Sequence, residues 1–370
     1  MTNKIKTRES NIELLRIISI ILIICFHYVY KSNFLYTELN INTLFIKNMW
    51  FFGELGVNLF ILITGYYMLK NKVSLKKIIL LIFQIFFYNF LLYSIGYFIG
   101  YNSFELNIFL IFPIITSKYW FATAYLLVYI LSPFFNKLIN SLKKTEYKKF
   151  IIINLIIWSI IPTVFGFFYN SSETLLFYNR FIWLCFMYFI GAYIRKYNIK
   201  FFESKKKCIL VSLITFLMMM MTIIVLYVFR DYFTKVGTTE IAYFWTPNNI
   251  LMFVLSISTF IFFTKLKIKP CKVINKFAST TLGIYLLHDG QLTAYMWQNI
   301  FHSNINIYSN DWFIHVGIAT FLIFLLGFLI DSLRQIIEKY TIKKLMNLKF
   351  WKTKNNNLKL KIQAIIDKLL

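Results

Sequence analysis

The stretch NIELLRIISIILIICFHYVY, residues 11–30, is apolar enough to cross a membrane yet contains Glu13, Arg16 and His27. A charge at mid-helix costs ~2.5–3.5 kcal/mol on insertion scales, so such residues are rare and usually functional or paired. On a helix, Arg16 and His27 would lie within about 20° of one face and about 16 Å apart along the axis. Glu13 is three residues before Arg16, close enough for an ion pair. The alternative is that Glu13 and Arg16 snorkel to the interface and His27 bonds a neighbouring helix.

Other polar side chains in apolar runs indicate a polar interior. Glu54 opens the second run on the outer side, level with His27, where it either orients the imidazole or caps a wet helix end. Arg180 opens the sixth run on the same side, and either holds an anionic or sugar ligand or anchors the interface. His288 and Asp289 lie near the middle of the ninth run and point about 100° apart, so we do not expect both to face lipid. A structural, hydrogen-bonded histidine is the alternative there.

The composition defines the elements that must position these residues. The chain has 370 residues, of which 59% are hydrophobic, 20% aromatic and 15% charged, whereas about a quarter of a soluble domain is charged. About 20 apolar residues cross a membrane as a helix. The sequence therefore predicts an all-α integral membrane bundle of about ten transmembrane helices. Their approximate ranges are 11–30, 50–69, 78–100, 119–136, 150–169, 178–195, 208–229, 247–264, 277–300 and 312–333.

The basic residues predict the orientation. Of 40 Lys and Arg, 33 fall in segments on one side of a ten-helix chain, which predicts that both termini are cytoplasmic. The net charge of +25 is thus a topology signal with attraction to anionic membrane lipids, and we expect no nucleic-acid partner. We predict a membrane domain over residues 1–333 and a basic cytoplasmic tail over 334–370. In the tail, basic and apolar residues alternate, which favours an amphipathic helix on the inner surface over a solvated tail.

Four segments carry a family resemblance. RIISIILIICFH, residues 16–27, resembles the R-x-x-A-x-x-x-V-x-x-x-H signature of the acyltransferase-3 family of membrane proteins, with Ser19 for the usual Ala. GVNLFILITGYYML, residues 56–69, is similar to the family's G-V-x-L-F-F-x-L-S-G-Y-L stretch. KYWFATAYLLVYILSPFFN, residues 118–136, resembles its W-F-x-x-x-Y-L…S-P segment, and TLGIYLLH, residues 281–288, its late I-Y-L-x-H element. The four occur in the family's order across nearly the whole membrane domain.

The resemblance implies an O-acyltransferase of the bacterial cytoplasmic membrane. Such a protein moves an acyl group, usually acetyl, from cytoplasmic acetyl-CoA to a hydroxyl of an envelope polysaccharide, glycolipid or lipid-linked glycan. Acyl-CoA is then a donor substrate, and we expect no permanently bound cofactor and no metal. The site residues are expected to be His27 as general base with Glu54 for catalysis; Glu13, Arg16, Lys72, Lys76 and Lys77 for the donor; and Trp120, Arg180, Tyr285 and His288 for the acceptor or for support. The Trp120 N–H and the Tyr285 O–H are chemically able to stabilise an oxyanion.

The sequence departs from the family pattern in two respects, and two other functions are alternatives to acyl transfer. Asn58 stands where the family often has a carboxylate, and Lys72, Lys76 and Lys77 stand where arginines are common. Intramembrane Arg, His and Glu would equally serve a proton-coupled transporter or exporter of a glycan or small molecule. The low content of Gly, 12, and Pro, 5, argues against it by predicting few broken helices. A polysaccharide polymerase or ligase is the second rival, and the modest outer connections argue against it.

Overall fold

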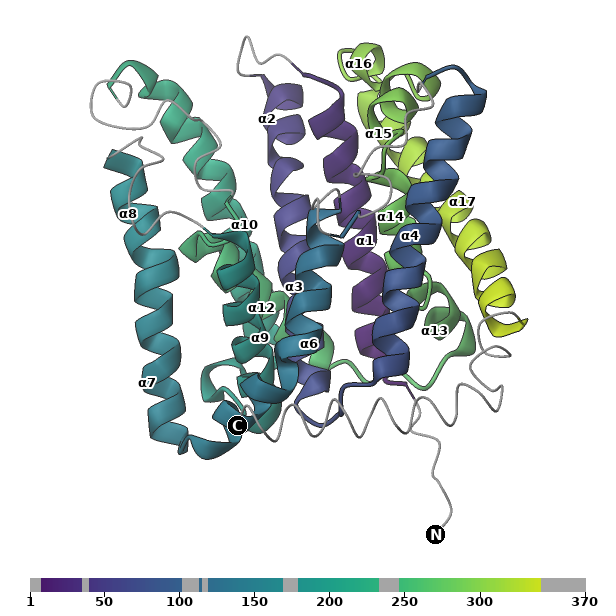
Figure 1. Cartoon of the computed structure of the whole chain (residues 1–370). Helices are drawn as coiled ribbons and strands as arrows, with labels where there is room; N and C mark the ends of the chain where they lie inside the picture. Colours follow the sequence, from purple (N-terminus) through teal and green to yellow (C-terminus); the bar gives the residue numbers. More distant parts are fainter. Residues whose placement is uncertain are drawn as a thin grey trace.

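The computed structural model of the chain is a helical bundle (Figure 1). It describes residues 8–34, 40–101, 113–114, 119–168, 179–232 and 246–340. Within those ranges every regular element is a helix, which confirms the all-α class. Helices α1 and α17 start and end the described chain, and the start of α1 and the end of α17 lie on the same side of the bundle.

The helices follow one another in a simple order. Their bounds are α1 Ser10–Lys31, α2 Ile41–Asn48, α3 Trp50–Met68, α4 Leu75–Phe98, α6 Trp120–Ser141, α7 Lys144–Leu155, η1 Ile156–Ile160, α8 Ile161–Phe168, α9 Arg180–Lys196, η2 Lys200–Phe202, α10 Lys205–Val228, α12 Ile250–Thr264, α13 Lys272–Ala278, α14 Thr281–His288, α15 Thr293–Tyr295, η4 Met296–Ile300, α16 Ser303–Asn306 and α17 Trp312–Tyr340.

Seven helices of the described chain are long and apolar enough to cross a membrane, so the protein is a multi-pass membrane protein. They are Ser10–Lys31, Ile41–Met68, Leu75–Phe98, Trp120–Ser141, Lys144–Phe165, Lys205–Val228 and Trp312–Tyr340. The predicted spans 178–195 and 247–264 correspond to shorter helices, α9 with 17 residues and α12 with 15. The count of ten and the cytoplasmic position of the termini stay predictions.

The predicted ninth span, 277–300, is not one helix. It is divided between the end of α13, α14, α15 and η4, and α14 ends at His288 with Asp289 as its C-cap. A turn over residues 289–292 separates α14 from α15. The expectation of few broken helices, drawn from the low Gly and Pro content, is therefore wrong at this place.

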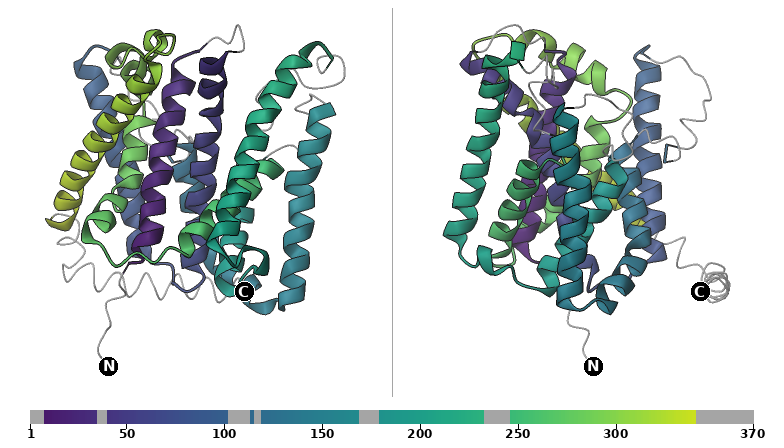
Figure 2. Two further views of the ribbon diagram at one scale, coloured as in Figure 1. Left: turned by 180° about the vertical axis from the view of Figure 1, so that it is seen from behind. Right: turned by 90° about the vertical axis from the view of Figure 1, so that its left-hand side faces the viewer.

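Helix α3 packs between α1 and α9 in the centre of the bundle, as the views in Figure 2 show. On one side, Gly65 of α3 faces the Tyr188 carbonyl of α9, and Gly191 of α9 faces the Leu62 carbonyl of α3. A Cβ at either glycine would collide with the opposite backbone. Small residues allow this close approach of helices, which packing in membranes relies on.

The other side of α3 packs on α1 through residues of the two N-terminal motifs. A Cβ at Gly56 would lie 2.7 Å from the backbone carbonyl oxygen of Ser19, so position 56 must be small. Ser19 is fully buried, and its hydroxyl donates to the Leu15 carbonyl oxygen at 2.7 Å. The small residue of the first motif and the first glycine of the second thus form one helix contact, which fixes α1 against α3.

Asn58 joins three helices. Its side chain is fully buried, and its Nδ2 donates to the Pro247 carbonyl oxygen at 3.0 Å and to Ser256 Oγ at 3.1 Å. Its Oδ1 accepts from Trp183 Nε1 at 2.9 Å. A carboxylate could accept from Trp183 but could not donate to the Pro247 carbonyl. The amide at this position is therefore part of the packing of α3, α9 and α12.

A buried carboxylate of α17 accepts hydrogen bonds from α4 and forms an ion pair within its own helix. Asp331 is fully buried and accepts hydrogen bonds from Gln84 Nε2 at 3.1 Å and Tyr88 Oη at 3.0 Å, both on α4. Arg334, one turn along α17, donates to the same carboxylate at 2.6 Å. The predicted tail of 334–370 therefore begins within α17, which continues to Tyr340, and residues 341–370 lie outside the described chain.

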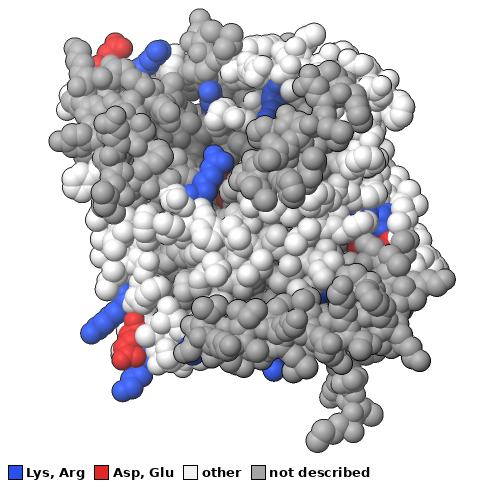
Figure 3. Space-filling view, in the orientation of Figure 1, with Lys and Arg blue, Asp and Glu red and all other residues white. Residues whose placement is uncertain are grey.

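The exterior fits a lipid environment. Large apolar side chains of α10 and α17 are exposed, among them Leu213, Leu217, Phe321 and Leu325. In Figure 3, uncharged surface covers most of the middle of this face, and Lys and Arg side chains are visible at its lower edge. Such an apolar belt is what a bilayer requires of helices whose backbone groups are paired internally.

Candidate functional site

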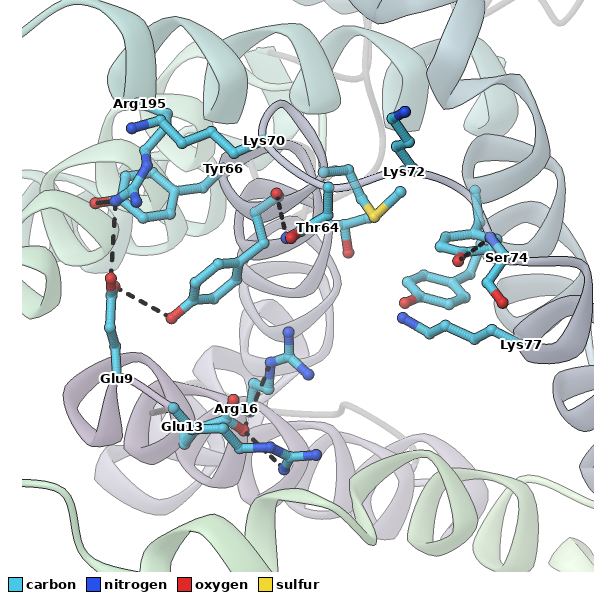
Figure 4. Close-up of a pocket in the computed structure, with 16 residues that line it drawn as sticks. Glu9, Glu13, Arg16, Thr64, Tyr66, Lys70, Lys72, Ser74, Lys77 and Arg195 are labelled. Atoms are coloured by element: carbon cyan, nitrogen blue, oxygen red, sulfur yellow. Dashed lines mark hydrogen bonds and ion pairs between the residues drawn. The ribbon is translucent and has the colours of Figure 1, made fainter. Parts of the chain in front are cut away.

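A polar cavity of about 390 Å³ opens at the end of the bundle where α1 begins (Figure 4). Side chains of α1, of α3 and the following turn, and of α4, α6 and α9 line it. Six of the lining residues are basic: Arg8, Arg16, Lys70, Lys72, Lys77 and Arg195. Two are acidic, Glu9 and Glu13, so the described lining has a net positive charge.

The two carboxylates hold part of this positive charge in place. Glu13 Oε2 lies 4.0 Å from Arg16 Nε, so the predicted pair forms, and it also lies 3.9 Å from Arg8 Nη1. Glu9 lies 3.9 Å from Arg195 Nη1 and accepts a hydrogen bond from Tyr67 Oη at 3.2 Å. In Figure 4 both carboxylates lie on the α1 side of the cavity. The Arg16 side chain is 30% exposed, so it is accessible to a ligand.

The predicted donor-binding lysines divide into two groups. Lys72 and Lys77 line the cavity, and Lys77 Nζ lies 4.8 Å from the centre of the Tyr129 ring. Lys76, which is exposed, lies outside the described lining. Lys76 and Lys77 differ in this respect because both lie in the first turn of α4, which begins at Leu75, and adjacent helical residues point about 100° apart.

Sequence reasoning missed Tyr66, Tyr67 and Arg195. Arg195 donates to Tyr66 Oη at 2.6 Å, and its guanidinium lies 4.4 Å from the centre of the Tyr66 ring. In the sequence, Arg195 was one of the basic residues that predict the orientation in the membrane. Tyr66 and Tyr67 lie within the motif of residues 56–69, where no role was predicted for them. No spacing rule within one helix brings α9 to the start of α1, so only the fold places them here.

His27, which lies farther along α1 than Arg16, forms a buried pair with His288 of α14. His27 Nδ1 is 3.0 Å from His288 Nε2, and His288 Nδ1 is 2.6 Å from the carbonyl oxygen of Ile284. On the other edge of the His27 ring, Nε2 is 3.4 Å from Asp289 Oδ1. His288 is fully buried and His27 is 7% exposed. The break after α14 brings Asp289 to His27, because the chain leaves the helix at that residue.

Two tyrosines surround Asp289. The hydroxyl groups of Tyr285 and Tyr119 both interact electrostatically with the Asp289 carboxylate. The Tyr285 ring also packs edge-on against His288, with ring centroids 6.2 Å apart. The site thus places two imidazoles and a carboxylate beside two O–H donors in a nearly dry setting, groups that are chemically able to accept a proton and to stabilise an oxyanion.

Glu54, Arg180 and Trp120 form a separate group. The Arg180 guanidinium lies 4.7 Å from the centre of the Trp120 ring and interacts electrostatically with Glu54. Arg180 is exposed, whereas Trp120 and Glu54 are partly buried. The structure therefore places Trp120 beside Arg180 and gives Glu54 the guanidinium as an electrostatic partner.

A protein-family model matches the chain over this whole region. The family model described as Acyltransferase domain matches residues 9–332, a range that includes the histidine pair and the described cavity lining except Arg8. The chain therefore belongs to the acyltransferase-3 family and is a membrane protein of the acyl-transferring class. No curated protein and no solved structure matches the chain.

Proposed function

We propose that this protein transfers an acetyl group from cytoplasmic acetyl-CoA to a hydroxyl of a cell-envelope glycan or glycolipid in the bacterial cytoplasmic membrane. The observation that carries the proposal is the arrangement along α1. Arg16 lines a basic cavity at one end, and His27, eleven residues or about 16 Å farther, lies in a buried cluster with His288 and Asp289. One helix thereby joins an anion site to a base.

The cavity suits the charged end of the donor. CoA has several phosphate charges at one end and a thioester at the end of a long, narrow arm. Arg16, Arg195 and the three lysines offer N–H donors to phosphate oxygens, and charge-assisted contacts of this kind are the stronger hydrogen bonds in proteins. The arm would then extend outward beside α1 toward His27, which explains why charge is concentrated at one end of the site.

His27 would act as the base. The acceptor hydroxyl gives its proton to the imidazole while its oxygen attacks the thioester carbonyl carbon. The carbon–sulfur bond breaks, the ester forms, and the thiolate leaves with the proton returned by the imidazolium as free CoA. Tyr285 and Tyr119 are O–H donors near this point and could stabilise the oxyanion of the tetrahedral intermediate. Direct transfer is preferred because the balance requires no acyl-enzyme.

Trp120 and Arg180 would hold the acceptor. The indole presents a flat face to which a sugar ring can pack, and the exposed guanidinium can donate hydrogen bonds to hydroxyl or acidic groups of the glycan. Glu54 would position Arg180 through their electrostatic interaction and support the acceptor side of catalysis.

The proposal predicts transfer across the membrane. The purified protein is reconstituted into sealed proteoliposomes of known orientation, with labelled acetyl-CoA on the side of the basic cavity. Envelope glycan stripped of its O-acyl esters by mild base is placed on the opposite side. We expect labelled ester on the glycan, and no label with His27→Ala. A requirement for both substrates on one side would contradict the sidedness, and label with His27→Ala would contradict the base.

One observation favours a second function, a proton-coupled transporter. The helix broken at Asp289, beside two buried histidines, resembles the discontinuous helices that form transporter sites. The same vesicles distinguish the two functions. Proton flux that accompanies glycan movement without acetyl-CoA would favour the transporter, whereas labelled ester favours the transferase.

A further inference from the structure

The hydrogen bonds of the histidine pair determine which nitrogen of each ring carries a proton. The Ile284 carbonyl oxygen can only accept, so His288 Nδ1, 2.6 Å away, must be the donor. A neutral His288 then has an unprotonated Nε2, which can only accept. His27 Nδ1 is 3.0 Å from that nitrogen and must therefore carry its own proton. In a neutral His27 the free lone pair is then on Nε2.

We propose that His288 and the Ile284 carbonyl are positioning groups that hold His27 as the Nδ1–H tautomer, which makes Nε2 the base atom. Asp289 then stabilises the imidazolium that forms when Nε2 takes the acceptor proton. The proposal rests on the proposed function, in which His27 is the base of acyl transfer. It identifies the reacting atom, which the sequence motif does not.

The position of Asp289 agrees with this role. Its carboxylate oxygen is 3.4 Å from Nε2, longer than the ~2.6–3.2 Å of a good catalytic hydrogen bond, as expected for two acceptors with no proton between them. Proton uptake at Nε2 would place an N–H opposite a carboxylate and favour a tighter ion pair. Among the described residues, Lys31 on α1, Tyr285 on α14 and Tyr119 before α6 are further charged or titratable groups around the pair.

The opposite arrangement has a different consequence. If His288 were protonated on both nitrogens, its Nε2–H would donate to His27 Nδ1, and His27 would carry its proton on Nε2 toward Asp289. His27 would then have no lone pair for the acceptor. A buried cation at His288, which has no solvent exposure, would also be required. The two arrangements differ in the protonated nitrogen of His27, which can be measured.

Nitrogen NMR of the full-length protein in proteoliposomes reads that nitrogen directly. The chain has four histidines, so ¹⁵N-histidine labelling with the variants His302→Asn and His315→Asn identifies the signals of the buried pair, and His288→Gln, which removes one of the two, distinguishes His288 from His27. We expect a protonated Nδ1 and an unprotonated Nε2 for both rings. An unprotonated Nδ1 on His27 would overturn the proposal whatever the activity, because it requires the opposite tautomer.

Variants of His288 test the same idea through rates. In His288→Gln the side-chain carbonyl can still accept from His27 Nδ1, and we expect kcat within about tenfold of wild type, the value of one neutral hydrogen bond. In His288→Leu no acceptor is left, and kcat should fall toward the ~10²–10⁴-fold that general-base catalysis contributes, with KM for acetyl-CoA unchanged. Equal rates for the two variants, both stable, would overturn the positioning role.

Two variants of Asp289 should differ in their transfer rates, in an order that a purely structural role of Asp289 would not produce. In Asp289→Asn the side-chain amide would donate to His27 Nε2 and mask the base, a fault that costs about 10⁴-fold when a Ser-His-Asp triad is given the wrong tautomer. Asp289→Ala removes only the stabilisation of the imidazolium, so it should be faster than Asp289→Asn. A faster rate for Asp289→Asn than for Asp289→Ala would refute the role of Asp289. Full activity of His27→Ala would instead refute His27 as the base, and a wild type that forms no ester would refute the proposed function itself.

Discussion

Removing the Arg16 guanidinium should weaken donor binding by an amount that the structure allows us to calculate. Arg16 is the more exposed partner of a pair in which the Glu13 side chain is only 6% exposed. In Arg16→Gln the cavity loses a cation for phosphate, while Glu13 keeps a negative charge facing the polyanion. We therefore expect this substitution to remove the attraction of Arg16 for the donor phosphates and to leave them repelled by Glu13.

The magnitude follows from general values. A hydrogen bond to a charged group contributes about 1.5–3 kcal/mol, and each 1.4 kcal/mol is tenfold in affinity. Because the Arg16 side chain is nearly a third exposed, solvent screening favours the lower half of that range. We expect KM for acetyl-CoA to rise about 10- to 30-fold, with a much smaller change in KM for the glycan.

The assay has two internal comparisons. Adding Glu13→Gln to Arg16→Gln should recover part of the loss, because it removes a carboxylate whose remaining partner is the exposed Arg8. Lys76→Gln, an exposed cation outside the described lining, is the matched control, and Lys77→Gln, its neighbour within the lining, should raise the donor KM. The reasoning is refuted if Arg16→Gln affects both substrates equally, or if Lys76→Gln matches Lys77→Gln.

Three predictions concern the scaffold and are measured by thermal unfolding in detergent. Asn58→Asp should lower the melting temperature, because a buried carboxylate cannot donate to the Pro247 carbonyl, and a buried unsatisfied group costs about 1–3 kcal/mol; an unchanged melting temperature would contradict the role of the amide. Arg334→Met should cost ~3–5 kcal/mol by leaving Asp331 as an uncompensated buried charge, and adding Asp331→Asn should restore much of the stability, because the amide oxygen is neutral and still accepts from Gln84 and Tyr88. If the double variant is no better than the single, the ion-pair argument fails. Gly191→Ala should destabilise the contact of α3 with α9, whereas Gly317→Ala, where a Cβ meets no atom within 4 Å, should not. Equal melting temperatures would show that α3 and α9 can move apart at little cost.

Features within one helix were predictable from the sequence. The period of 3.6 residues places Glu13 beside Arg16, and the ion pair is present. The long apolar runs predict helices because backbone groups in hydrocarbon must be paired internally. The four motifs identify the family, which the match over residues 9–332 confirms.

Contacts between distant helices were not predictable in this way. His27 and His288 are 261 positions apart, so their contact depends on the packing of α1 against α14. The break at Asp289 had a local signal, since Asp-Gly is a turn dipeptide, but the surrounding apolar run suggested a continuous helix. The roles of the site residues in catalysis and binding stay predictions.

The central claim, acyl transfer with His27 as base, is tested most directly by single-turnover acetylation. Purified wild type, His27→Ala and the control His302→Asn are compared with labelled acetyl-CoA and de-O-acylated envelope glycan. His302 is exposed and has a φ of 48°, a conformation that asparagine tolerates. We expect the ester-forming rate of His27→Ala to fall ~10²–10⁴-fold at equal protein recovery, with His302→Asn unchanged. A His27→Ala protein that forms ester at the wild-type rate would contradict the account.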